Sequence, residues 1–200
     1  MSPEDKLVFA ASCGDIRRIV ELYNSGVSVN SCFSTTGSTA LSRAARHGHL
    51  DVCRVLVQLG AQVYDSLSRN ASSLHSASGG GHEEIVSYLL SVGARVNSMK
   101  SENDETAGHV AARWGRRGVL EILWKNGADF RLKSIKGRNV VEEALHWGED
   151  ETADWARRKT ENSRSLQLCC KLAIIHFCGR TNILHLPLPQ RLKDYLKQTA

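Results

Sequence analysis

Proline, aromatic residues and long apolar runs are all scarce in this 200-residue chain. Three prolines and 6% aromatic residues disfavour a β-sandwich and favour a helical protein. No stretch approaches the ~18 apolar residues that a membrane-spanning helix needs, so no span is expected. Met1 to Ala11 lack a basic stretch followed by an apolar one, so no signal peptide is expected. We therefore expect a cytoplasmic protein, with the nucleus as a further compartment.

Recurrent catalytic and metal-binding patterns are missing as well. The chain has no glycine-rich phosphate loop, no nucleophile elbow and no zinc-hydrolase helix. Its eight histidines lack a second ligand at helical spacing, and its cysteines do not fall into metal-ligand spacings. Reduced thiols in a cytosolic protein are the simplest interpretation of the cysteines. We predict no enzyme, no metal site and no cofactor.

The charge of the chain is only weakly unbalanced. It has 26 Lys and Arg residues against 21 Asp and Glu residues, a net charge of +5. The excess is partly local, because eight basic residues but only Glu121 and Asp129 lie between Arg113 and Arg138. Such a patch can attract nucleic acid or an acidic protein, or it can be a solvated face. We favour the solvated face because no nucleic-acid-binding motif accompanies the charge.

A repeat of 33 or 34 residues organises most of the chain. Five glycines keep this spacing, namely Gly14, Gly48, Gly81, Gly115 and Gly148. A second glycine follows twelve residues behind each of the first four, at Gly26, Gly60, Gly93 and Gly127. Glycine readily adopts the left-handed conformation that ends helices. Each unit is therefore predicted to contain two short helices, each ended by a glycine.

Other columns of the repeat predict the helices themselves. Nine residues before the glycines of the first set stand N-cap residue types, in Asp5, Thr39, Ser72, Thr106 and Asn139. Small residues just before these glycines, such as Ala44-Ala45, would let neighbouring helices approach closely. Apolar residues of the second helices recur at i, i+1, i+4 and i+5, which is one stripe of a helix.

These columns resemble the ankyrin family, whose repeat of ~33 residues comprises two helices and a β-turn. The resemblance covers about residues 1–158 and implies an all-α solenoid of about five repeats. It also implies that the histidines of the motifs bind backbone between repeats. Gly108 departs from the pattern, because the family prefers leucine there, and Thr160 replaces the closing glycine of the fifth repeat. The matching segments include Thr39-Ala40-Leu41, Ser73-Leu74-His75, Gly48-His49, Gly81-His82 and Gly127-Ala128-Asp129.

An ankyrin stack is expected to recognise a protein partner on its concave face. That face would include the turn tips and the two residues before each glycine of the first set. Arginine and tryptophan, which most often dominate binding energies, are predicted there as Arg46, Arg69, Arg113, Trp114 and Trp147. A partner with an apolar anchor flanked by acidic residues would fit them. The alternative is that either tryptophan packs on a neighbouring repeat or under the segment that follows.

The pattern changes after a predicted linker at residues 159–164. Residues 165–174 are predicted to form a helix with Leu166, Cys170 and Ile174 on one face and further leucines on another. A short helix that is apolar on two faces must be covered on both. One face can cover the last repeat, and the other needs a partner.

Residues 165–198 resemble a SOCS box. In the first half, the elongin-binding box at residues 165–174, the resemblance implies that Leu166, Cys170 and Ile174 contact elongin C, which pairs with elongin B. In the second half, the cullin box at residues 183–196, two prolines fix an extended turn. This half has the form associated with cullin five and its RING partner. The implied cullin-binding residues are Leu186, Pro187, Leu188 and Pro189.

The combination resembles the ankyrin-repeat-and-SOCS-box proteins. The resemblance implies a non-catalytic adaptor that binds a target protein on its repeats and promotes its ubiquitination. Elongins B and C and cullin five would be its partners, and proximity to the conjugating enzyme would be its contribution. Two alternatives stay open. Residues 165–198 could form a helical hairpin that only caps the stack, or the protein could be an ankyrin scaffold or inhibitor that binds without degradation.

Overall fold

The computed structural model describes residues 1–63, 72–99 and 103–161. The chain divides into two compact units, Met1–Ala156 and Arg157–Ala200, and only residues 157–161 of the second unit are described. Residues 150–161 are helical and follow the last labelled helix. The labelled helices are α1 (Pro3–Cys13), α2 (Ile16–Asn24), α3 (Ala40–His47), α4 (Leu50–Gln58), α5 (Ser73–Gly80), α6 (Glu83–Ser91), α7 (Ala107–Arg113), α8 (Arg117–Lys125) and α9 (Val140–His146).

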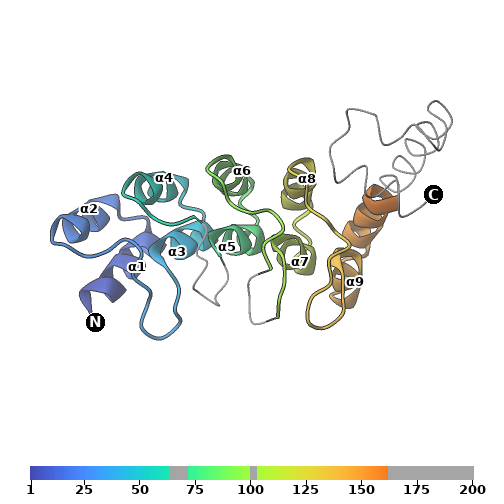
Figure 1. Ribbon diagram of the computed structural model, residues 1–200, viewed down its shortest axis with the longest axis horizontal. Helices are drawn as coiled ribbons and strands as arrows, with labels where there is room; N and C mark the ends of the chain where they lie inside the picture. Colours follow the sequence, from blue (N-terminus) through green and yellow to red (C-terminus); the bar gives the residue numbers. More distant parts are fainter. Residues whose placement is uncertain (64–71, 100–102, 162–200) are drawn as a thin grey trace, which may run out of the picture. The chain divides into compact units, whose positions relative to one another are not determined.

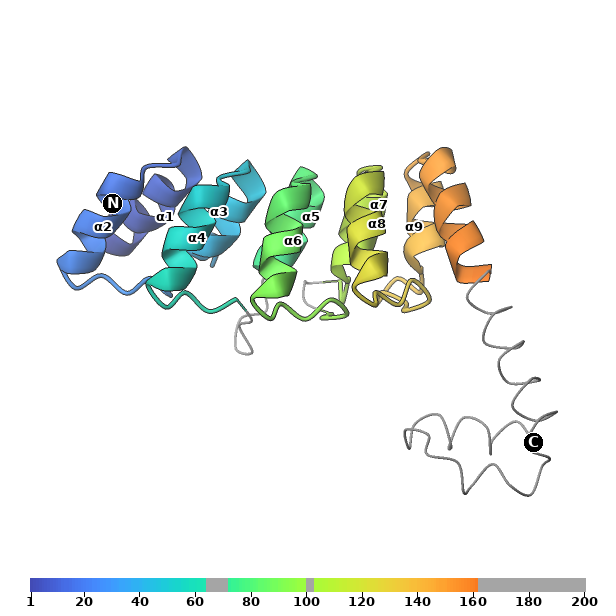
Figure 2. The ribbon, with the colours of Figure 1, turned by 90° about the horizontal axis from the view of Figure 1, so that it is seen from above.

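The helices of the first unit are arranged as successive pairs, which we number as repeats one to five. The first helices of the pairs, α1, α3, α5, α7 and α9, pack side by side in one row (Figure 1). The second helices α2, α4, α6 and α8 form another row, and the connections between repeats leave the stack on one side (Figure 2). The prediction of an all-α ankyrin solenoid of about five repeats is therefore confirmed.

Small side chains fill the contacts between neighbouring first helices. The residues three and four positions before the first-set glycines are almost all buried, which lets the helix backbones approach closely. Larger apolar residues of the second helices, such as Ile19, Leu56, Leu89 and Leu123, complete the core. The buried small residues are Ala10, Ala11, Ala44, Ala45, Ala77, Ser78, Ala111, Ala112 and Ala144.

Four of the five predicted N-caps are confirmed, and the fifth is wrong. Thr39, Ser72, Thr106 and Asn139 are the N-caps of α3, α5, α7 and α9. Asp5 instead lies inside α1, which Ser2 caps. Proline at the first helical position starts that helix one turn earlier. The Asp5 carboxylate is used differently and accepts hydrogen bonds from the backbone N–H and the hydroxyl of Ser34 at 2.9 and 3.1 Å.

The unusual Gly108 in α7 is explained by a large neighbour. A Cβ atom at Gly108 would lie 3.2 Å from Val140 and 3.5 Å from the ring of Phe130. Phe130 is fully buried, and its ring centroid lies 5.1 Å from that of Trp124 and 6.2 Å from that of Trp155. Repeats one to three have valine in the Phe130 column. The aromatic ring thus occupies the volume that a leucine at position 108 would need.

Candidate functional site

Histidines join each repeat to its neighbour. His75 in α5 lies 2.8 Å from the backbone oxygen of Glu105, and His109 in α7 lies 3.0 Å from that of Arg138, in each case through Nε2. Nδ1 of His109 accepts from the backbone N–H of Thr106 at 3.2 Å, so Nε2 carries the proton and donates. Burial lowers the pKa of His109, which keeps this ring neutral.

The paired Gly-His motifs make similar contacts at the other end of the helices. His49 Nε2 lies 3.0 Å from the backbone oxygen of Ser12, and His82 Nε2 lies 3.0 Å from that of Arg46. With His75, these contacts confirm that the histidines of the ankyrin motifs bind backbone between repeats.

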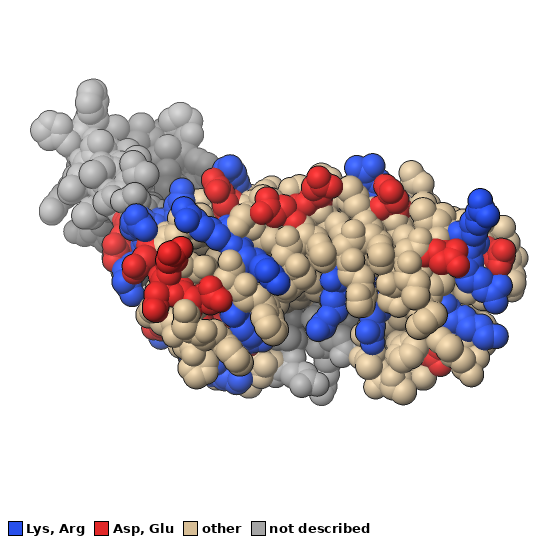
Figure 3. Space-filling model, turned by 180° about the vertical axis from the view of Figure 1, so that it is seen from behind, with Lys and Arg blue, Asp and Glu red and all other residues tan. Residues whose placement is uncertain are grey.

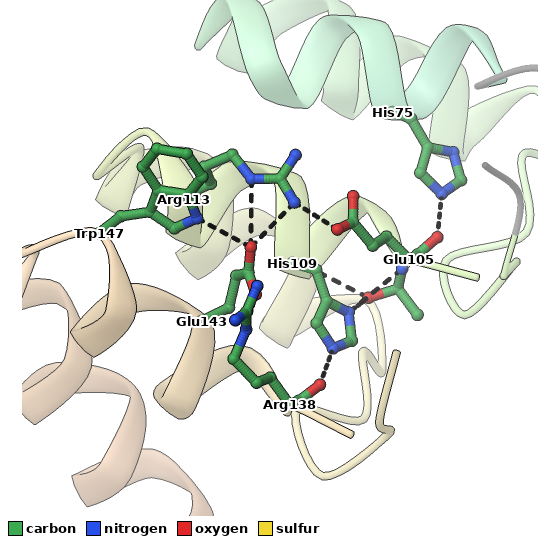
Figure 4. A network of polar contacts seen from close by, with 8 residues as sticks. His75, Glu105, His109, Arg113, Arg138, Glu143 and Trp147 are labelled. Atoms are coloured by element: carbon green, nitrogen blue, oxygen red, sulfur yellow. Dashed lines mark hydrogen bonds and ion pairs between the residues drawn. The ribbon is translucent and has the colours of Figure 1, made fainter. Parts of the chain in front are cut away.

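Arg113, one of the predicted partner-binding residues, lies in an ion-pair network between repeats four and five (Figure 4). Its guanidinium pairs with Glu105, in the connection before α7, and with Glu143 of α9, where Nη2 is 2.8 Å from Oε1. Arg138 binds the second oxygen of Glu143 at 2.7 Å. The Arg113 side chain is only 20% exposed, and that of Glu143 is fully buried. Arg113 is therefore engaged within the protein.

Glu143 is the centre of this network. Burial on its own would raise the pKa of the carboxyl group. Hydrogen bonds from Arg113, Arg138 and the indole N–H of Trp147, which lies 3.0 Å away, outweigh burial and lower the pKa of Glu143 to about 2. The carboxylate is thus ionised at neutral pH, and it holds together side chains from three segments.

The two tryptophans of the predicted surface have different surroundings. Trp147 is 54% exposed, and the Arg113 guanidinium lies 5.6 Å from its ring centroid. Trp114 is 57% exposed. A Cβ atom placed on Gly79 would lie 4.0 Å from Trp114, so its indole lies beside the end of α5. Among the described residues, Trp114 has no ring contact and no cation–π contact.

Arg46, in the equivalent position of repeat two, is exposed, as is its neighbour His47. Burial and the neighbouring basic side chains His49, Arg43, Arg46 and His82 lower the pKa of His47. Arg43 contacts the hydroxyl of Thr36 at 3.2 Å. In the described ranges, neither Arg43 nor Arg46 pairs with a carboxylate.

Sequence reasoning missed the buried part of this region. Glu143 and Arg138 were not among the predicted site residues. The usable signal is spacing: Glu143 follows Arg113 by 30 residues, so it falls in the next repeat near the same height on the first helix. Arg69 lies outside the described residues, and so do the predicted elongin-binding residues Leu166, Cys170 and Ile174 and the cullin-binding residues Leu186, Pro187, Leu188 and Pro189.

The described residues offer no alternative site chemistry. Within them, no group of three metal-ligating side chains is placed to hold a metal ion. None of their helices is both long and apolar enough to cross a membrane. On the face drawn in Figure 3, basic and acidic side chains are interspersed. The features that remain for recognition are the exposed Trp114 and Trp147, and Arg43 and Arg46 of repeat two, which pair with no carboxylate of the described residues.

Comparison with known proteins agrees with this architecture. Ankyrin-repeat families match residues 7–57, described as ankyrin repeats (many copies), and residues 64–134, described as ankyrin repeats (3 copies). The SOCS box family matches residues 162–197. The chain is also similar to the ankyrin repeat and KH domain-containing protein mask-1 of Caenorhabditis elegans. The two sequences are 38% identical over 150 residues, which cover 73% of this chain. The chain spans only 4% of the length of that protein.

This combination is typical of non-catalytic adaptors, and a SOCS box implies an adaptor that joins a substrate to elongin B/C and a cullin. The chain therefore has the architecture in which ankyrin repeats are followed by a C-terminal SOCS box.

Proposed function

We propose that this protein is the substrate-recognition subunit of a cullin-five ubiquitin ligase. Its ankyrin repeats would hold a target protein, and residues 165–198 would recruit elongins B and C and then cullin five with its RING partner. The observation that carries the proposal is the presence of both families in one chain, the SOCS box match starting directly after the last repeat. The adaptor itself performs no bond chemistry. It raises the concentration of the target's lysines near the conjugating enzyme.

The rigid packing of repeats four and five supports this role. The Arg113–Glu143 pair ties α7 to α9, and Arg138, before α9, and Trp147, at its end, bind the same carboxylate. An adaptor must hold its target at a defined distance from the enzyme, since flexible attachment lowers effective concentration. Buried, fully hydrogen-bonded ion pairs resist local opening because breaking them leaves an uncompensated charge.

The elongin contact provides the first test. A Leu166→Ala/Cys170→Ala double variant should lose co-purification with elongins B and C, because each change removes apolar surface from one face of the predicted helix. Its repeats should still melt as in the unaltered protein, measured by circular dichroism. A matched Arg17→Ala/Cys32→Ala variant, changed only in the repeats, should keep elongin binding. Unaltered elongin capture by the double variant would refute the assignment.

The cullin contact and the ubiquitination reaction provide the second test. Replacing Leu186, Pro187, Leu188 and Pro189 by alanine should weaken cullin-five binding and spare elongin binding. Equal binding of the unaltered protein to cullin two would remove the pairing with cullin five. If the chain captures a partner protein and elongins B and C, yet the reconstituted ligase transfers no ubiquitin to that partner, the scaffold or inhibitor function is correct instead.

A further inference from the structure

Small residues lie between the basic residues Arg43 and Arg46 of repeat two and Trp114 of repeat four. There, α5 ends with Gly79 and Gly80, which carry no side chains. A Cβ atom on Gly80 would lie 2.5 Å from the ring of His82 and 2.8 Å from the backbone oxygen of Arg46. A Cβ atom on Gly79 would lie 3.1 Å from Val110 and 4.0 Å from Trp114. Arg46, the two glycines and Trp114 are thus consecutive neighbours across three repeats, and we refer to them as the Arg46–Trp114 strip.

One end of the strip is positively charged, and no carboxylate of the described residues pairs with it. Arg43 and Arg46 lie three residues apart on α3 and therefore share a face of that helix. The described residues provide no carboxylate partner for either guanidinium. Burial and the neighbouring basic groups, including Arg43 and Arg46, lower the pKa of the adjacent His47. Such a cluster favours a negatively charged ligand.

The other end of the strip is apolar. Trp114 leaves 57% of its surface to solvent, and Val110 lies one helical turn before it on α7. An exposed tryptophan beside Val110 and Gly79 can receive an apolar group of a partner, and tryptophan is enriched among binding hot spots. Gly79 and Gly80 add no side chain of their own at the end of α5, where Val110 lies beside Gly79 and His82 lies beside Gly80.

We propose that the Arg46–Trp114 strip binds an extended, acidic segment of the partner protein, with carboxylates on Arg43 and Arg46 and an apolar side chain against Trp114. The inference rests on the proposed function in that it assumes a protein partner for the repeats. It assigns recognition to repeats two to four and leaves Arg113 and Trp147 to the internal network. The interaction is one of charge complementarity at one end and apolar burial at the other.

The fold also sets a spacing for this segment. Packed helices lie ~8–10 Å apart, so the axes of α3 and α7 are separated by about twice that distance, since only α5 lies between them. An extended peptide advances ~3.3 Å per residue. The acidic residues and the apolar residue of the segment should therefore be about five residues apart.

Selection from a phage library of random 16-residue peptides on the immobilised full chain tests this proposal. The enriched peptides should carry two or more acidic residues about five positions from an aromatic or large aliphatic residue. Enrichment of neutral or basic peptides, or of none, would overturn the proposal.

Variants then locate the contact. The dissociation constant of the best synthetic peptide should rise about tenfold or more for Arg43→Glu/Arg46→Glu, for Trp114→Ala and for Gly79→Leu, which fills the centre of the strip. The control Arg17→Glu/Arg117→Glu makes the same charge change at exposed residues of α2 and α8 and should alter it by less than about twofold. Equal weakening by the control would mean that binding follows net charge alone.

Two further measurements separate the possible failures. Thermal melting by circular dichroism identifies any variant that loses binding by unfolding, and in that case the remaining variants decide. Peptide binding should persist in the Leu166→Ala/Cys170→Ala protein. If that protein keeps peptide binding while the unaltered chain fails to capture elongins, the strip stands and the ligase function falls. Displacement of the peptide by a mixed-sequence oligonucleotide at physiological salt, with stronger binding of the oligonucleotide, would overturn the choice of a protein ligand.

Discussion

Arg46 and Arg113 occupy equivalent positions of repeats two and four, yet they have opposite surroundings. Arg113 faces Glu105, eight residues before it, and Glu143, 30 residues after it. At the same two offsets from Arg46 stand Ser38 and Ser76. One arginine is consequently held by carboxylates and mostly buried, and the other is exposed. In a repeat protein, the role of a charged side chain thus depends on the residue that the next repeat places opposite it.

Removing the carboxylate of Glu143, which pairs with Arg113, should have the largest effect on stability. Glu143→Ala removes the carboxylate that pairs with Arg138 and leaves Arg113 with Glu105 alone. Breaking a buried pair from one side costs about 3–5 kcal/mol. We expect the free energy of unfolding, measured by urea denaturation, to fall by that amount. Glu84→Ala, an exposed glutamate of α6, is the matched control and should change it by less than ~0.5 kcal/mol. A small loss for Glu143→Ala would show that water replaces the network.

Acid should weaken the network through the same carboxylate. The pKa of Glu143 in the folded protein, about 2, lies below the ordinary value of 4.5. A lowered carboxyl pKa stabilises the folded state fully above the unfolded value, and this contribution is lost as pH falls from about 4.5 towards 2. The loss attributable to Glu143 is on the order of 3 kcal/mol. Glu143→Gln should therefore show a flatter dependence of unfolding free energy on pH in this window. Parallel curves for the two proteins would contradict the assignment.

Replacing Arg113 should lower the free energy of unfolding more than replacing Arg46. Arg113→Ala removes one of two cationic partners of Glu143 and the cationic partner of Glu105, and we expect a loss of about 2–3 kcal/mol. Arg46→Ala removes an exposed side chain without a carboxylate partner, and its effect on stability should stay within ~0.5 kcal/mol. Urea unfolding of both variants under one condition measures the difference. Similar losses would show that the surroundings of the two residues are less distinct than their ion pairs indicate.

The repeating part of this structure could be predicted from sequence, because glycines, N-caps and small residues recur in fixed columns. Each column imposes the same backbone requirement in every repeat, so one misplaced element such as the Asp5 cap leaves the others intact. Pairs of residues in which a change in one repeat is matched by a change in another position could not be predicted in this way. Gly108 is a departure within its own column, and only its contact with Phe130 explains it. The relevant information lies between repeats, in contacts that a column-by-column comparison does not include.

The same limit applies to the candidate site. The sequence predicted that Trp114 and Arg46 occupy one surface, since both positions follow from helix geometry, and both side chains are exposed. It assigned Arg113 to that surface for the same reason. The carboxylates that engage Arg113 come from a connection and from the next repeat, so they are distant from its column in sequence. Placing Arg113 and Trp147 in the substrate surface stays a prediction. Binding through the Arg113 guanidinium would require its network to open, whereas 54% of Trp147 is already exposed.

Transplanting the carboxylates should convert the strip into a second closed network, with the smallest effect on stability. Ser38→Glu/Ser76→Glu places glutamates at the two offsets from Arg46 that Glu105 and Glu143 have from Arg113. The site is more exposed than its counterpart, so the new pairs should stabilise the protein by no more than about 1 kcal/mol. Binding of an acidic peptide should nevertheless weaken about tenfold or more, because Arg46 then has an internal counter-charge that the ligand must displace. Peptide titration and urea unfolding of one protein sample measure both effects. Ser38→Gln/Ser76→Gln adds similar volume without charge and should retain most of the affinity. Equal loss for the glutamine variant would mean that side-chain volume, and not the pairing of Arg46, controls access to the strip.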